Sequence, residues 1–72
     1  MSEEINKLID EAKEAISKGE KEKGRSLLIK AVRLATELQN GANYLEKLKY
    51  TVLINELNRM IKNLDSGNDE NE

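Results

Sequence analysis

The chain contains no histidine, cysteine, proline, tryptophan or phenylalanine, and its only aromatic residues are two tyrosines. Histidine and cysteine are the commonest general bases, nucleophiles and transition-metal ligands, so their absence argues against most catalytic and metal-dependent chemistry. Disulfide bonds are impossible for the same reason. We therefore expect a protein that is not an enzyme and that needs neither a cofactor nor a metal ion.

Long hydrophobic runs are also missing from the sequence. No apolar stretch approaches the roughly 18 residues that a membrane span requires. The N-terminal residues Met1, Ser2, Glu3 and Glu4 are acidic overall, which is not typical of a secretory signal or a mitochondrial transit peptide. These features predict a cytoplasmic protein with no transmembrane segment.

The net charge of −2 conceals an uneven distribution. Residues 1–17 carry two bases and five acids, residues 18–64 carry ten bases and five acids, and residues 65–72 carry four acids. The basic stretch from Lys18 to Arg33 leaves open a small nucleic-acid-associated protein, because phosphate contacts require only such cations. Glu20 and Glu22 interrupt this stretch, and two tyrosines make a poor stacking platform, so nucleic acid is the weaker alternative.

Hydrophobic residues recur at helical spacing in three segments. The first helix is predicted over about 3–17, with Ser2 as its N-cap and Gly19 just beyond its end. A charged segment containing Gly24 follows, and the second helix is predicted over about 25–39. The third is predicted over about 44–64, because Asn43 and Glu46 have the spacing of a capping box.

Seventy-two residues allow one domain, and short connections make successive helices antiparallel. The fold class is therefore predicted to be all-α, an up-down-up antiparallel three-helix bundle over residues 1–64. Residues 65–72 are polar and acidic without apolar periodicity, which predicts a disordered C-terminal tail.

The third helix has more apolar surface than one buried stripe requires. At about 100° per residue, its main apolar residues share one broad face, whereas Leu45, Leu48 and Val52 lie on roughly the opposite side. One interpretation is that the second helix or the first loop covers these side chains, or that the helix begins later. The other is that they line an exposed groove together with Ile29, which would accept an amphipathic helix.

Several segments resemble the microtubule-interacting-and-transport (MIT) domain, and to a lesser degree a tetratricopeptide helix pair. The segments are Asp10–Ile16, Leu27–Val32 and Leu57–Leu64, the last with Arg59, Ile61, Lys62 and Leu64 near the end of a long third helix. The resemblance implies a non-catalytic adaptor that binds short amphipathic peptides beside helix three. It assigns no individual groove residue.

The sequence thus favours a helical protein–protein interaction module. Its expected partner is a helix of a protein or peptide, or a second copy of the chain as a homodimer, and the predicted partner-binding residues are Leu45, Leu48, Val52 and Ile29. A structural scaffold without any ligand remains a further alternative beside nucleic-acid association.

Overall fold

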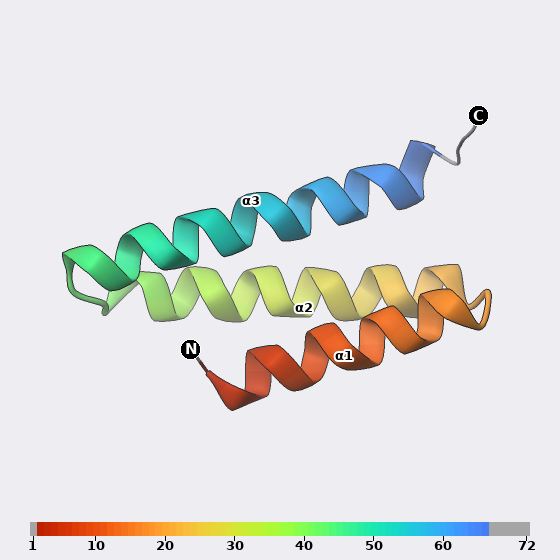
Figure 1. Cartoon of the computed structure of the whole chain (residues 1–72), viewed down its shortest axis with the longest axis horizontal. Helices are drawn as coiled ribbons and strands as arrows, with labels where there is room; N and C mark the ends of the chain where they lie inside the picture. The colour runs from red at the N-terminus through yellow and green to blue at the C-terminus, as the bar shows by residue number, and fades with distance from the viewer. Residues whose placement is uncertain (1, 67–72) are drawn as a thin grey trace.

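The computed structural model of the chain describes residues 2–66, which form three α-helices. These are α1 (Glu3–Ser17), α2 (Lys21–Asn40) and α3 (Tyr44–Ser66). They run up, down and up with short connections, as Figure 1 shows, so the predicted all-α three-helix bundle is confirmed. The predicted tail falls mostly on residues 67–72, which lie outside the described residues, whereas Asp65 and Ser66 belong to α3.

The helix ends follow the predicted capping signals. The Ser2 hydroxyl accepts hydrogen bonds from the N–H groups of Glu4 at 3.1 Å and Ile5 at 3.4 Å. At the start of α3, the Asn43 side-chain oxygen accepts from the N–H of Glu46 at 2.9 Å. Such caps satisfy backbone donors that have no partner inside the helix, so they fix where α1 and α3 begin.

The turn after α1 is tighter than predicted. Gly19 has a left-handed φ of +83° and donates its N–H to the Ile16 carbonyl, while the N–H of Glu20 donates to the Ala15 carbonyl at 2.9 Å. This pair of bonds is a Schellman motif, which ends a helix abruptly. Because it completes the turn by Glu20, α2 begins at Lys21, and the prediction that this helix begins near residue 25 was wrong.

Gly24 lies inside α2 and is buried rather than part of a loop. A Cβ atom at this position would lie 2.5 Å from Cγ1 of Ile16 and 3.2 Å from the carbonyl oxygen of Ala12. The absence of a side chain therefore allows α1 to approach α2 closely. This contact explains a glycine in a helix interior, where it costs about 1 kcal/mol relative to alanine.

Helix α2 lies between the other two helices in the view of Figure 1. Each neighbour packs against α2, whereas no Cα atom of α1 comes within 8 Å of one in α3. Side chains of all three helices nevertheless meet in a core cluster formed by Ala12, Leu28, Ala31 and Leu57. The buried hydrophobic residues are Ile5, Ala12, Ala15, Leu28, Ala31, Ala35 and Leu57. Since four of these seven are alanine, the core is thin.

Two polar contacts set the register of α2 against α3. Arg25 donates from Nε and Nη2 to the two carboxylate oxygens of Asp65, at 2.7 and 3.2 Å. Fourteen residues further along α2, the side-chain amide of Gln39 donates to Thr51 Oγ1 at 2.6 Å. Because Thr51 also lies fourteen residues before Asp65, each step forward along α2 corresponds to one step back along α3.

The Gly24 contact generates a stability prediction. Gly24→Ala should lower the free energy of unfolding by up to about 2 kcal/mol, because overpacking costs about 1–3 kcal/mol and the gain in helix propensity offsets roughly 1 kcal/mol of that cost. Gly41→Ala is the matched control, since no atom lies within 4 Å of a Cβ built there. Urea denaturation followed by circular dichroism measures both. A more stable Gly24→Ala variant would contradict the proposed close approach.

The Arg25–Asp65 pair predicts a pH dependence. The hydrogen bond from Arg25 holds the pKa of the Asp65 carboxyl below its ordinary value. The pair therefore stabilises the fold above the ordinary titration range of an aspartate, and this contribution is lost as the pH falls through the lowered pKa. Asp65→Asn should lower the unfolding midpoint slightly at pH 7, with the difference disappearing in strong acid.

Both side chains of this pair are about half exposed, so the effect should also weaken in high salt. Asp10→Asn is the control, because this exposed aspartate has no ion-pair partner among residues 2–66. Thermal unfolding of both variants across pH and salt concentration makes the comparison. An Asp65→Asn difference that persists unchanged in strong acid would contradict the assignment.

Candidate interaction surface

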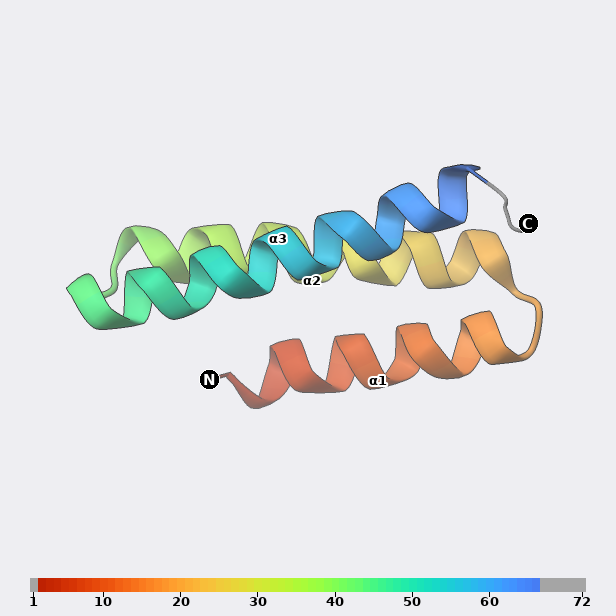
Figure 2. The ribbon, with the colours of Figure 1, turned by 45° about the horizontal axis from the view of Figure 1, so that its top comes forward.

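The three helices differ in length, and this difference leaves one end of the molecule incompletely covered. Helix α1 has 15 residues, α2 has 20 and α3 has 23. At 1.5 Å per residue they are about 22, about 30 and about 34 Å long. Figures 1 and 2 both show α1 beginning well short of the end where α2 joins α3. That end consists of two helices rather than three.

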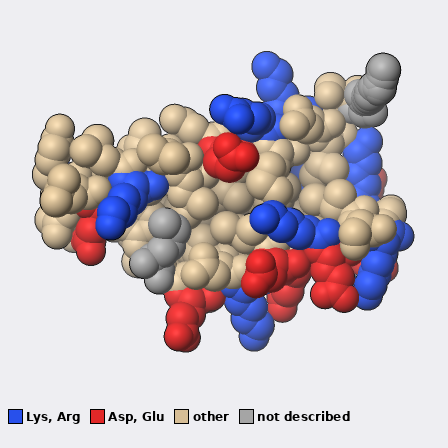
Figure 3. All heavy atoms as spheres, in the orientation of Figure 1, with Lys and Arg blue, Asp and Glu red and all other residues tan. Residues whose placement is uncertain are grey.

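Large apolar side chains are exposed at this two-helix end. Leu45 is 68% exposed, Leu48 47% and Val52 69%, and the neighbouring Tyr44 is 74% exposed. We call Tyr44, Leu45, Leu48 and Val52 the α3 patch. In Figure 3 uncharged atoms form most of the surface at this end, which is on the left of the view. Neither α2 nor the first loop covers the patch, and α3 begins at Tyr44 as predicted.

The helical period explains why the α3 patch stays exposed. Leu57 is the α3 residue that is fully buried against the other helices, with 1% exposure. Val52 precedes it by five residues, which places the two side chains about 140° apart around the helix axis. Leu45 and Leu48 lie on the same side as Val52. The patch therefore points away from the core and has no covering element within residues 2–66.

Ile29, the fourth predicted partner-binding residue, lies apart from the other three. It is half-buried on α2, four residues after Arg25, and is therefore level with Ile61 of α3. Ile61 is nine residues beyond Val52, which corresponds to about 13 Å along the helix. The structure thus brings Leu45, Leu48 and Val52 together and leaves Ile29 outside the α3 patch.

Two apolar residues at the same end were not predicted as exposed. Leu38 of α2 is 36% exposed and Tyr44 is 74% exposed, and neither was among the predicted partner-binding residues. Leu38 precedes Gln39, so it is level with Val52, beyond the start of α1. The predicted lengths of the first two helices were equal, at 15 residues each, so the mismatch became visible only with the observed 20-residue α2.

The basic stretch from Lys18 to Arg33 does not form a uniform cationic face. Lys18 pairs with Glu14 at 3.1 Å, and Lys23 pairs with Glu20 at 3.9 Å. Arg25 is bound by Asp65. Half of the six bases in this stretch thus have a carboxylate neighbour, which reduces their capacity to contact phosphates.

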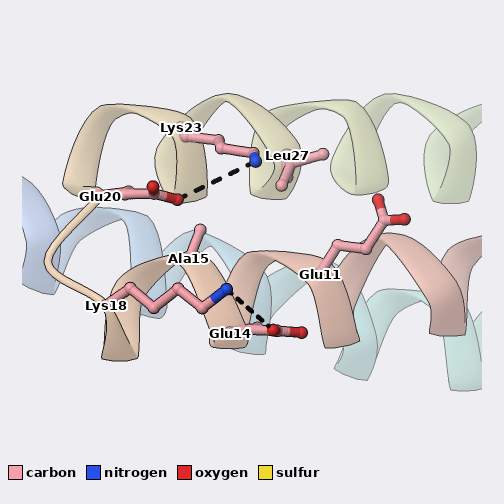
Figure 4. A pocket seen from close by; sticks show the side chains of 7 residues that line it. All are labelled: Glu11, Glu14, Ala15, Lys18, Glu20, Lys23 and Leu27. Carbon is pink, nitrogen blue, oxygen red and sulfur yellow. Dashed lines mark ion pairs between the residues drawn. The ribbon is translucent and has the colours of Figure 1, made fainter.

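A hollow of about 290 Å³ lies between α1 and α2 near their connecting turn. Figure 4 shows the residues that line it: Glu11, Glu14, Ala15, Lys18, Glu20, Lys23 and Leu27. Its lysines pair with nearby carboxylates, Lys18 with Glu14 and Lys23 with Glu20 (dashed lines in Figure 4). Among residues 2–66 no group of three or more carboxylates is arranged to hold a metal ion. The hollow is therefore a charged surface depression with no apparent ligand chemistry.

Comparison with known proteins identifies no relative of the chain. No family model matches the chain, and neither a curated protein nor a solved structure matches it. Within the described helices, none has both the length and the apolar character for crossing a bilayer.

The contrast between core and patch is testable by mutation. Leu57→Ala should lower the free energy of unfolding by about 2–5 kcal/mol, because it leaves a cavity in the thin core. Leu48→Asp should cost less than about 1 kcal/mol, since the side chain already contacts solvent. Chemical denaturation of the two variants measures the difference. Equal losses would mean that Leu48 is part of the core.

Proposed function

We propose that the protein is a non-catalytic helical interaction module that binds an amphipathic helix on the α3 patch. The observation that carries this proposal is the exposure of Leu45, Leu48 and Val52 on one side of α3. Contiguous exposed apolar side chains on a small protein commonly mark an interaction surface. The function follows from this surface rather than from any reactive group.

The spacing within the α3 patch favours a helix as the ligand. Leu48 follows Leu45 by three residues and Val52 follows Leu48 by four, which is the a-d-a spacing of a coiled-coil seam. A partner helix with apolar residues at the same spacing would insert its side chains between them. Leu38 and Tyr44 would lie at the edge of such a contact.

The thin core supports the same proposal. Domains of this size usually gain stability from disulfides, a structural metal, very regular helix packing or association with another chain. The sequence has no cysteine, and four of the seven buried hydrophobic residues are alanine. Covering the α3 patch would add apolar burial that the single chain lacks. The resemblance to the microtubule-interacting-and-transport domain implies an adaptor of the same kind, and membership of that family is part of this proposal.

A photochemical cross-link tests the proposed surface. Val52 is replaced by the photoreactive amino acid benzoylphenylalanine, and the protein is irradiated both purified and in a cell extract. We expect a covalent adduct that maps by mass spectrometry to one amphipathic helical segment. The adduct should disappear in a chain that also carries Leu48→Asp, because the charge opposes burial of the patch.

The same photoreactive residue at Lys30, an exposed position on α2, is the matched control. An adduct at residue 52 that is no stronger than at residue 30, or that survives Leu48→Asp in a folded chain, would contradict the proposed function. The mass of the adduct also shows whether the bound helix belongs to another protein or to a second copy.

A further inference from the structure

A shallow hollow that shares Val52 with the α3 patch has charged and apolar side chains arranged in order along the helix. It is lined by Lys49, Val52, Leu53 and Glu56. Lys49 and Glu56 are seven residues apart, which is about 10 Å or two helical turns, and the two apolar residues lie midway between them. The hollow thus has a positive end, an apolar middle and a negative end.

The arrangement of charges along the hollow is complementary to the same arrangement running in the opposite direction. A two-fold axis between Val52 and Leu53 would place α3 of a second copy antiparallel to the first. Lys49 would then lie opposite Glu56 of the second copy, and Glu56 opposite Lys49 of the second copy. Val52 would be level with Leu53 of the second copy, so the apolar middle of one hollow would meet that of the other at the axis. Such an interface, with the same patch on both subunits, is typical of two-fold homodimers.

The same register also covers Leu45 of the α3 patch. With the axis between Val52 and Leu53, Leu45 would be level with residue 60 of the second copy and would pack beside residue 59. This residue is Arg59, whose aliphatic stem provides apolar surface beneath its charged end. The exposed apolar side chain and the arginine stem would therefore be covered by one contact.

Charge disfavours the competing register. A two-fold axis between Leu48 and Lys49 would set Leu45 level with Val52 of the second copy, but it would also bring the two Lys49 side chains together near the axis. Within residues 2–66, Lys49 has no carboxylate within 4 Å, and Glu56 is paired only with Arg59 of its own helix, at 3.5 Å. Both end groups of the hollow are exposed and accessible to an opposite charge from another chain.

We infer that the helix bound by the α3 patch is α3 of a second copy, packed antiparallel about a two-fold axis between Val52 and Leu53, with reciprocal Lys49–Glu56 ion pairs. This inference rests on the proposed function and names its partner. Opposite charges at the two ends of an apolar contact select the register and the antiparallel direction.

Charge reversal tests the inference by analytical ultracentrifugation across protein concentration. Lys49→Glu alone and Glu56→Lys alone each set like charges against each other, so each should raise the dimer dissociation constant by at least about tenfold. An equimolar mixture of the two variants should form a heterodimer, because every pair is then attractive. The double variant, Lys49→Glu with Glu56→Lys, should dimerise like the unmodified chain.

Lys30→Glu and Glu37→Lys are the matched controls, since they make the same charge changes at exposed positions of α2. Circular dichroism confirms that every variant is folded. A chain that stays monomeric up to about millimolar concentration, or a mixture that fails to associate when each variant alone does, overturns the inference. If a Leu48-dependent adduct of another protein forms at Val52 while the chain is monomeric, the proposed function stands and only the second copy is refuted.

Discussion

The contact of Gly24 with Ile16 and Ala12 determines how the rest of the molecule is arranged. It holds the C-terminal half of α1 against the first turns of α2, and the Schellman turn at Gly19 keeps the connection between the two helices short. With that end fixed, the 15 residues of α1 extend only part of the way along α2. The two-helix end is a consequence of this anchoring, and the α3 patch lies at that end, on the side of α3 that faces away from the core.

The position of α2 between two neighbours explains the composition of the core. A helix that packs on two sides at short range requires small side chains where the backbones approach, and the buried residues of α2 are Gly24, Leu28, Ala31 and Ala35. Small residues bring helices together but contribute little apolar area. The fold thus combines close packing at the centre with large apolar side chains at an uncovered end. Covering that end would bury apolar area that the core lacks.

The sequence predicted the features that depend on local rules. Ser2, Asn43 and Gly19 signalled helix ends by capping chemistry, and helical spacing placed Leu45, Leu48 and Val52 opposite the core face. The start of α2 was mispredicted because Gly24, among charged residues, looks like a helix breaker unless its tertiary neighbour Ile16 is known. Ile29 was misplaced relative to the patch, and the ion pair of Arg25 with Asp65 was missed, because both depend on the register of two helices.

The arrangement also bears on how the chain reaches its fold. Backbone contacts between helices join only neighbours in the sequence, α1 with α2 and α2 with α3. Such a topology has a low contact order, and helical domains of this kind fold within microseconds to milliseconds. The chain has no proline, so no slow prolyl isomerisation interrupts the process. Each hairpin of helices closes over a short turn, whereas the core cluster of Ala12, Leu28, Ala31 and Leu57 requires all three helices.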